Sequence, residues 1–363
     1  MAISTSLLYP KNGNHSLGQS TLWTDTQELE KMTRLIRKRI VLDAGNRFIK
    51  WLDPEGRVRC IPSYVLATET WQEVTWDDES VVVEVDGKKY VIGKIAKELG
   101  GKPIFSESKT DWACLLAYVA LEPNLGENTL TVEELVYFLP DTRHQQSVEG
   151  VKKIETVVSA KEFRRNGVDI VATVQRAIPT DETRGAYCYA IRNGLFNYPQ
   201  LTNGVVNIGG GNISCHVYLP NLKNPERAII DRDQDLNLKG KGTAYLAEKI
   251  AAAVAPMIGE RPSADWIMDG IADGSFTIAQ TGTYFKPQFD AAQEIYCSEL
   301  RGRIKTGWSR ALATMGEVLV VGGSATLVKP IVDLFQCRWR IPAKENMDSF
   351  SQFIDIYGMA EVK

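Results

Sequence analysis

Three apolar stretches of this sequence each end in a glycine turn, and this recurrence constrains the fold more than any other feature. They are IVLDAGNRFIKWL (residues 40–52), GVVNIGGGNISCHVYL (204–219) and EVLVVGGSATLVKPIVDLF (317–335). The first two have the pattern of strand, turn and strand, and the third of strand, turn and helix. Glycines at such turns let backbone N–H groups approach a phosphate without a Cβ in the way.

None of these turns is a standard nucleotide motif by itself. The chain has no G-x-G-x-x-G opening a helix and no G-x-x-x-x-G-K-[ST], which excludes the Rossmann fingerprint and the P-loop. Taken singly, the first turn is also compatible with an ordinary hairpin, and Gly209–Gly211 with a wide β-turn. Only the order and spacing of the turns along the chain favour a phosphate site.

The composition is that of a globular protein that can hold more than one core. With 363 residues, 44% of them hydrophobic, the chain has the length of two or three domains. A formal charge of −3 gives no general reason to expect binding to nucleic acid or membranes. No apolar run approaches the roughly 20 residues that span a bilayer, and no signal peptide is apparent, so we expect a cytoplasmic location.

Cysteine and histidine usage excludes other site types. The six cysteines are widely separated and form no C-x-x-C pair, and the sequence has only three histidines. We therefore expect buried reduced thiols rather than structural zinc, and no histidine-dependent nucleophilic catalysis.

Periodicity and turn signals predict further elements around the three turns. A flexible N-terminal arm is expected to lead into a short helix over residues 24–39. Asp86-Gly87 predicts a tight hairpin in a small β-rich insert. A helical region over 287–314 is expected to bring Gln288, Arg301, Arg303 and Lys305 near a ligand cleft. The remaining predictions are helices over 108–121, up to Asn193-Gly194, over 239–254 and within 349–362, and strands over 130–140 and near 338–341.

Glu182 stands at the mouth of the predicted helix in PTDETRGAYCYAIRNGLF (residues 179–196). A carboxylate in this position can simply complement the helix dipole, which contributes about 0.3–1 kcal/mol. It can equally serve in catalysis. The residues alone leave both roles open.

Six segments, in this order, resemble the motifs of ParM-type and archaeal actin-like ATPases, which belong to the actin, Hsp70 and sugar kinase superfamily. The similarity covers roughly residues 40–363, and the order of the motifs is more specific than any one of them. The segments are LDAGNRFIKW, VDGKKYVIG, PTDETRGAY, VVNIGGGNIS, VLVVGGSATLV and QFIDIYGMA.

The resemblance implies an α/β, actin-like ATPase fold with two RNase H-like domains flanking a nucleotide cleft. Residues 1–39 would be a partly flexible extension. The expected divisions are domain I over 40–200 with an insert at about 57–110, domain II over 201–345 with a small subdomain at about 225–300, and a C-terminal helix over 346–363 that returns to domain I.

The resemblance also implies roles for individual residues. Asp43 would hold the water shell of Mg²⁺, Lys50 would contact the β- and γ-phosphates, and Glu182 would orient the attacking water. Asn207 completes the expected catalytic set. ATP or ADP, or alternatively GTP, would contact Gly45, Asn46, Lys50, Gly209, Gly210, Gly211, Asn212, Gly242, Gly322, Gly323 and Ser324.

The chain departs from the resemblance at three positions. Asn207 stands where the second phosphate motif normally begins with aspartate, and Ser214 replaces a later aspartate. Thr183 follows Glu182 where a proline is usual. Asparagine removes one negative charge beside the metal, so we expect nucleotide binding with slow hydrolysis.

Three functions remain open at this stage. The first is a filament-forming ATPase that segregates plasmids or positions DNA, whose partners would be identical subunits and a DNA-bound adaptor rather than DNA itself or a membrane. The second is a pseudo-ATPase scaffold with slow or absent hydrolysis. The third is a small-molecule kinase of the same superfamily, for which no clear catalytic aspartate is apparent.

Overall fold

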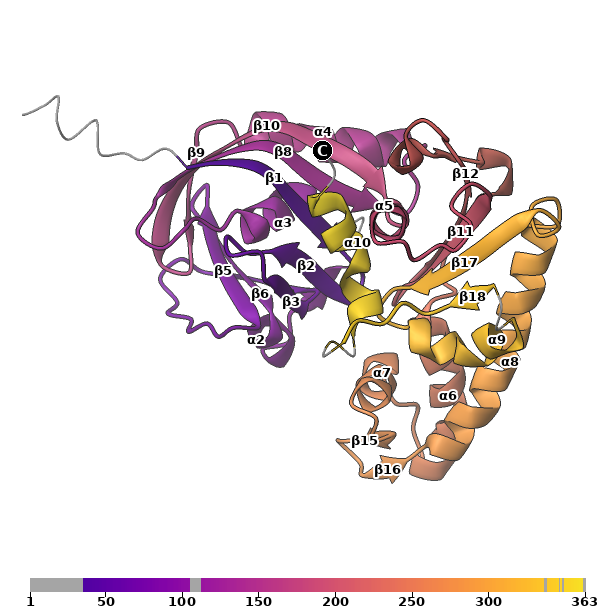
Figure 1. The fold of residues 1–363 in the computed structure, drawn as a ribbon. Coiled ribbons are helices and arrows are strands. Elements are labelled where there is room, and N and C mark those ends of the chain that lie inside the picture. Colours follow the sequence, from indigo (N-terminus) through magenta and orange to yellow (C-terminus); the bar gives the residue numbers. More distant parts are fainter. Residues whose placement is uncertain (1–34, 105–111, 336–337, 346, 348, 362–363) are drawn as a thin grey trace, which may run out of the picture. The chain divides into compact units, whose positions relative to one another are not determined.

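The computed structural model describes residues 35–104, 112–335, 338–345, 347 and 349–361, which form two large β-sheets with packed helices (Figure 1). This is the α/β architecture that the sequence predicts. Among the described residues, no helix is both long and apolar enough to cross a membrane.

The first sheet has ten strands in the order β3-β2-β1-β8-β10-β9-β5-β6-β4-β7. β1 runs parallel to β8 and β8 parallel to β10, so the carboxyl ends of these strands meet at one edge. The strands are β1 (Leu35–Ala44), β2 (Phe48–Leu52), β3 (Val58–Pro62), β4 (Tyr64–Thr68), β5 (Ser80–Val85), β6 (Lys88–Gly93), β7 (Lys102–Pro103), β8 (Thr129–Leu139), β9 (Lys161–Arg165) and β10 (Val168–Asp181).

β8 explains the long apolar runs in the sequence of this sheet. On one face, Leu135 and Tyr137 pack into the main core with helices α3 (Ala113–Ala120) and α4 (Gln145–Val157). On the other face, Val136 and Phe138 pack against helix α10 (Phe350–Ala360). The second half of β8, residues 135–139, is buried on both faces and has no solvent side to alternate with, so it is continuously apolar. The short helix α2 (Lys94–Glu98) follows β6.

The second sheet has the order β13-β12-β11-β17-β18, with β14 paired to β12. β11 is parallel to β17, and its hairpin partner β12 is antiparallel. Helices α6 and α8 pack against it and against each other. The elements are β11 (Thr202–Ile208), β12 (Ile213–Leu219), η3 (Pro225–Arg227), β13 (Ile229–Ile230), η4 (Arg232–Gln234), β14 (Leu236–Leu238), α6 (Thr243–Ile258), α7 (Ala264–Ala272), β15 (Thr277–Ile278), β16 (Thr283–Tyr284), α8 (Lys286–Gly307), β17 (Met315–Val321), η5 (Ala325–Val328), α9 (Lys329–Leu334) and β18 (Trp339–Arg340).

Most predicted elements are present, and one prediction is wrong. The hairpin at Asp86-Gly87 is confirmed, with φ of 52° and 70° at its two turn residues. The helix predicted over 24–39 is wrong for residues 35–39, which are the first half of β1, because pairing with β8 outweighs the local helical pattern. The rest of that prediction and residues 108–111 of the 108–121 helix lie outside the described residues.

Helices α5 (Arg184–Arg192) and α10 pack with their backbones almost in contact, and glycines permit this approach. A Cβ on Gly185 would lie 2.0 Å from the carbonyl oxygen of Asp355, and one on Gly358 would lie 1.8 Å from that of Gly185. The Asp355 Oδ1 atom accepts a hydrogen bond from the backbone N–H of Ala186 at 2.8 Å. The two helices therefore hold Asp355 in one position.

Gly185→Ala is expected to destabilise the protein by about 1–3 kcal/mol, because the added methyl group forces α5 away from α10. Gly302→Ala in α8 is the matched control, since its added Cβ has nothing within 4 Å and alanine favours a helix by roughly 0.5–1 kcal/mol. Urea unfolding of both variants measures the difference. Equal stability of the two variants would show that the helix contact is not tight.

Candidate functional site

A cavity of about 390 Å³ lies where the three glycine turns meet. This volume is typical of small-molecule sites. Of the residues to which the resemblance assigned a role, all but Gly242 line it. Those residues are Asp43, Gly45, Asn46, Lys50, Glu182, Asn207, Gly209, Gly210, Gly211, Asn212, Gly322, Gly323 and Ser324.

Asp43 and Lys50 are cross-strand partners in the hairpin of β1 and β2. The Lys50 ammonium donates to Asp43 Oδ2 at 2.8 Å and lies 3.4 Å from the carbonyl oxygen of Gln352. Burial by itself lowers the pKa of Lys50, but the Asp43 carboxylate outweighs burial and holds that pKa above its ordinary value. A charged, nearly buried ammonium thus faces the cavity beside a carboxylate.

The second turn, Gly209–Gly211, is backed by the first residues of α6. The backbone N–H groups of Gly242 and Thr243 donate to the carbonyl oxygens of Gly211 and Gly209, each at 3.1 Å. A Cβ on Gly242 would lie 2.4 Å from the Gly209 oxygen. Gly242 therefore supports the turn from behind and does not line the cavity, unlike the adjacent Thr243.

The third turn is packed on the second. Gly322 has φ of 96°, which favours glycine, and a Cβ there would lie 2.3 Å from Asn207 Oδ1. The N–H of Ser324 donates to the carbonyl oxygen of Ile208 at 3.2 Å, and the Ser324 hydroxyl hydrogen-bonds that of Thr243. The ends of β11 and β17 and the start of α6 thus form one connected rim.

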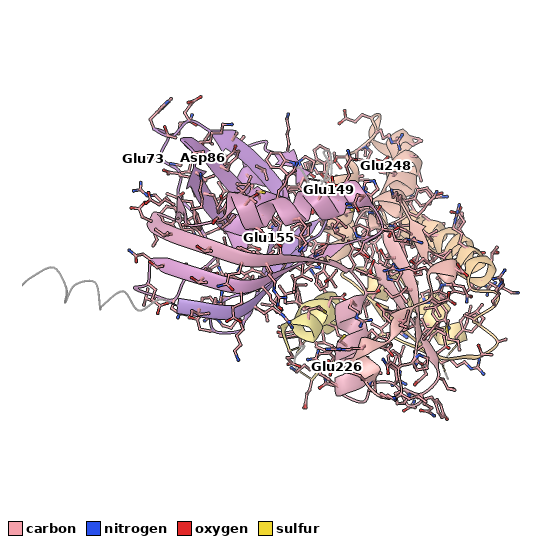
Figure 2. The ribbon with its side chains drawn as sticks, turned by 90° about the horizontal axis from the view of Figure 1, so that it is seen from above. Glu73, Asp86, Glu149, Glu155, Glu226 and Glu248 are labelled. Atoms are coloured by element: carbon pink, nitrogen blue, oxygen red, sulfur yellow. The ribbon has the colours of Figure 1, made fainter. Side chains whose placement is uncertain are left out.

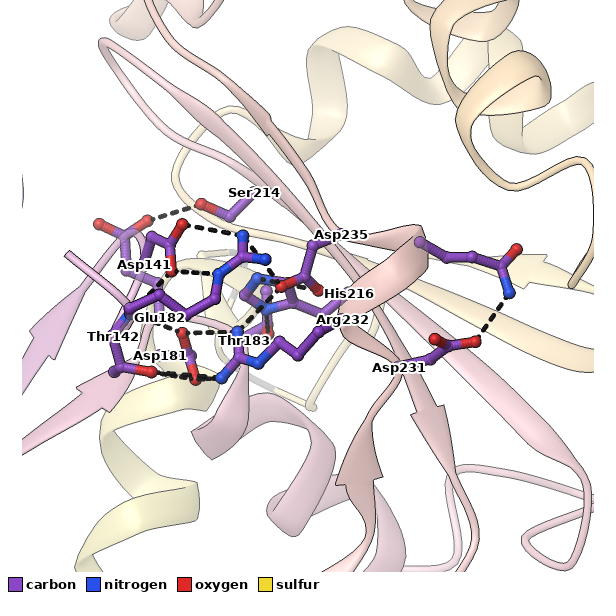
Figure 3. Close-up of polar contacts among 12 residues, drawn as sticks. Asp141, Thr142, Asp181, Glu182, Thr183, Ser214, His216, Asp231, Arg232 and Asp235 are labelled. Carbon is purple, nitrogen blue, oxygen red and sulfur yellow. Dashed lines mark hydrogen bonds and ion pairs between the residues drawn. The ribbon is translucent and has the colours of Figure 1, made fainter.

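Glu182 lies between the end of β10 and the start of α5, and its side chain lines the cavity. The hydroxyl of Ser214 donates to Glu182 Oε2 at 3.2 Å (Figure 3). An aspartate at position 214 would instead place a second carboxylate against Glu182. Ser214 therefore orients this carboxylate without repelling it.

Solved structures share this fold. ParM of pCBH, a non-polymerisable quadruple mutant, matches with a TM-score of 0.68 at 14% identity over 89% of this chain and 98% of its own. The archaeal actin homolog Ta0583 matches with a TM-score of 0.68 at 15% identity over 90% of this chain and 98% of its own. The chain has a ParM-type actin-like fold. No protein-family model and no curated protein matches the sequence. At these identities the likeness establishes the fold alone.

Behind Glu182, Arg232 joins the two sheets of the actin-like fold. Its Nη2 donates to Asp181 Oδ2 at 2.6 Å and its Nη1 to Asp235 Oδ2 at 2.9 Å. The hydroxyl of Thr142 donates to the same Asp181 oxygen at 3.0 Å. Asp181 ends β10 in the first sheet, whereas Arg232 and Asp235 precede β14 in the second. Figure 3 shows this group beside Glu182, and no local sequence pattern pointed to it.

A buried histidine completes this polar group. The Nδ1 atom of His216 and the hydroxyl of Thr183 are 2.5 Å apart. Burial lowers the pKa of His216, so its imidazole is neutral at neutral pH. Thr183, which directly follows Glu182, is therefore held to the second sheet by this hydrogen bond.

Asp355 is a cavity residue that sequence reasoning missed. It lines the same cavity as Asp43 and Glu182 but is only 7% exposed. Burial holds the pKa of Asp355 well above its ordinary value. One oxygen accepts from Ala186, and the other has no hydrogen-bond partner among the described residues. The available signal was an acid at an apolar helical position, between Ile354 and Ile356.

The expectation that α8 supplies cavity residues is wrong. None of the four residues proposed from it, namely Gln288, Arg301, Arg303 and Lys305, lines the cavity. Arg303 lines a separate hollow with Leu236 and Leu238. Helical periodicity identified α8 correctly but could not indicate which end of the sheet it would cover.

Proposed function

We propose that this protein binds a nucleoside triphosphate with Mg²⁺ in the cavity and self-associates into filaments in that state. The observation that carries the proposal is the meeting of three glycine turns around one buried ion pair, Asp43 and Lys50. We also propose that each sheet marks one of the two RNase H-like domains, divided between α5 and β11.

The solved neighbours support both parts of the proposal. Ta0583 has been solved in complex with ADP, at a TM-score of 0.68 and 14% identity to this chain. ParM from Clostridium botulinum has been solved as a 15-stranded filament, at a TM-score of 0.67 and 13% identity. Following the same resemblance, we propose a DNA-bound adaptor as a further partner, with a role in segregating DNA.

The residues present fit a nucleotide with its metal. Mg²⁺ is usually held by one or two carboxylates together with phosphates and water, and it would neutralise phosphate charge here. Asp43 and Asp355 are the acids placed for this task, and the Lys50 ammonium supplies a fixed positive charge for the phosphates. Backbone N–H groups of Gly210 and Gly211 would add neutral donors.

Hydrolysis would depend on Glu182, which could accept a hydrogen bond from an attacking water. Asn207 can orient a water but adds no charge. A scaffold that binds nucleotide without hydrolysing it is therefore the second candidate. Phosphate release distinguishes the two, because an assembling protein that binds ATP and releases no phosphate is the scaffold.

Light scattering with ATP, ADP, GTP and a non-hydrolysable analogue, with electron microscopy of the same samples, tests the proposal. We expect assembly with a triphosphate and its analogue, and less with ADP. Absence of nucleotide-dependent assembly under every condition would reject the filament function.

Asp355→Asn is expected to stabilise the nucleotide-free protein and to weaken Mg²⁺-dependent nucleotide binding. Because the pKa of Asp355 is raised in the folded state, unfolding releases its proton above the ordinary value of 3.8, and this favours unfolding as the pH rises. Asparagine removes that effect and can still accept from Ala186. We expect a gain of about 1 kcal/mol, or roughly 2 °C, at neutral pH, shrinking as the pH falls toward 3.8.

The binding part of this prediction is measured as ATP affinity with Mg²⁺ and with EDTA. A loss of about tenfold, or 1.4 kcal/mol, is expected with Mg²⁺ and little change without it. Asp355→Ala is the control, since it also removes the acceptor for the Ala186 N–H and should lower stability. Unchanged Mg²⁺ dependence in Asp355→Asn would show that Asp355 only holds α5 to α10.

A further inference from the structure

A second cavity, of about 420 Å³, lies between the C-terminal part of α8 and the strands β17 and β18. Its floor is apolar and includes Ile304, Met315 and Trp339, none more than 8% exposed. Phe335 stands at its edge, 42% exposed, with its ring stacked on Trp339 at a centroid distance of 5.4 Å. The cavity thus offers an aromatic wall and an apolar floor to an incoming side chain.

Three cations line the same cavity. The side chains of Arg301, Lys305 and Arg338 are exposed, and none makes an ion pair or side-chain hydrogen bond with another described residue. Arg340, by contrast, is neutralised by the buried carboxylate of Glu317. An apolar floor with three uncompensated positive charges around it suits a segment that carries both an aromatic side chain and carboxylates.

The chain itself contains such a segment. Residues 69–79, ETWQEVTWDDE, connect β4 and β5 and hold five acids and two tryptophans, with no lysine or arginine between Arg59 and Lys88. Trp71 is 76% exposed, which is unusual for the largest apolar side chain. Trp76 is 47% exposed and lies over Gly167. Trp76 therefore anchors the segment and leaves Trp71 pointing outward.

The acids of this segment are mostly uncompensated. Glu69, Glu73 and Asp77 make no ion pair with a described residue. The other two acids are paired, Asp78 with Arg59 at 3.9 Å and Glu79 with Lys94 at 3.0 Å. Figure 2 shows the Glu73 side chain pointing away from the ribbon. An exposed tryptophan in a segment whose only charged residues are acids complements the basic, aromatic cavity in both charge and apolar surface.

We propose that residues 69–79 of one copy dock into the cavity of α8, β17 and β18 on a second copy, with Trp71 in the apolar floor and the acids against Arg301, Lys305 and Arg338. This inference rests on the proposed self-association and identifies the two surfaces that would form the contact. The two surfaces belong to different sheets, so each copy presents both and the contact is head to tail. Such heterologous contacts give open chains where the rotation between copies does not close, and rings where it does.

Tryptophan and arginine are enriched among the residues that dominate the energetics of protein interfaces, and tryptophan buries a large area with only two side-chain torsions to fix. Trp71 beside arginine would also gain cation–π attraction. The charges would steer association and make it sensitive to salt. The inferred contact therefore combines one aromatic anchor with complementary charge.

Two full-length variants test the contact. The segment variant is Trp71→Ala with Glu73→Lys, and the cavity variant is Lys305→Glu with Arg338→Glu. All four side chains are exposed and make no ion pair with a described residue, so folding should be retained, which circular dichroism verifies. The matched controls are Tyr284→Ala with Glu260→Lys, and Arg303→Glu with Arg310→Glu, at exposed positions outside both surfaces.

Sedimentation with ATP, with ADP and without nucleotide gives the readout. Each test variant alone is expected to need at least about tenfold more protein than wild type to assemble, while the controls behave as wild type. An equimolar mixture of the two test variants should form dimers and stop there, because only one intact segment and one intact cavity remain between them.

The outcomes separate this inference from the proposed nucleotide function. Dimers in the mixture without measurable ATP binding would reject the nucleotide function and support the contact. ATP-dependent assembly of wild type with only monomers in the mixture, or test variants that assemble as wild type, would overturn the contact alone. A wild-type protein that binds ATP but stays monomeric in every condition would overturn the contact and the filament function, and leave nucleotide binding standing.

Discussion

Glu182→Ala is expected to slow phosphate release by about 10²-fold or more while changing ATP affinity only a few-fold. The reason is that Glu182, which directly follows β10, lines the cavity, and water activation by a positioned carboxylate contributes roughly 10²–10⁴-fold. Single-turnover phosphate release measures the chemical step even when wild-type hydrolysis is slow. ATP binding is measured separately by titration.

Ser214→Ala provides the graded comparison for Glu182. It removes the hydroxyl that donates to Glu182 Oε2 at 3.2 Å but leaves the carboxylate in place, so a smaller loss is expected. Phosphate release at the wild-type rate in Glu182→Ala would show that this carboxylate serves only the helix dipole of α5. Equal losses in both variants would indicate that orientation of Glu182 is decisive.

Asp43→Ala is expected to have the largest effect on both binding and stability. Lys50 is 9% exposed, and its ammonium donates to Asp43 Oδ2 at 2.8 Å, so the substitution leaves a buried charge without its carboxylate. Breaking such a pair costs about 3–5 kcal/mol. We therefore expect a large fall in the free energy of unfolding and loss of Mg²⁺-dependent ATP binding.

Asn207→Ala is the comparison for Asp43, since both side chains line the cavity at the end of a central strand. Asn207 carries no charge, so its loss should cost only about 1 kcal/mol in ATP affinity. Thermal unfolding with and without Mg²⁺ and ATP measures the effect of both substitutions. Comparable effects would contradict the assignment of the metal to Asp43 rather than to Asn207.

The parts of the site that the sequence predicted well are those whose requirements are local. Asp43 and Lys50 are seven positions apart on one hairpin, and Gly209–Gly211 follow one strand, so periodicity and glycine content identify both turns. The arrangement of the turns around one cavity came from the resemblance, whose motif order implied it.

Other parts escaped prediction because their partners are distant in the chain. The start of β1 at Leu35 depends on pairing with β8, nearly a hundred residues later, and the local pattern favoured a helix instead. Arg301 and Lys305 belong to a correctly predicted helix, yet they line a different cavity from the expected one. Neither outcome can be predicted from a short window of residues, because each depends on partners that are distant in the chain.

The sequence by itself thus determined most of the strands, the glycine turns, and the positions of Asp43 and Lys50 on the first hairpin, since backbone conformation and periodicity are properties of contiguous residues. Only the tertiary structure decided that Asp355 enters the cavity, that Ser214 donates to Glu182, and that Arg232 joins the two sheets behind it. The physical reason is that burial and electrostatic partnership depend on which surfaces pack together. The contact of α5 with α10, made possible by Gly185 and Gly358, places Asp355 beside Asp43 in the cavity.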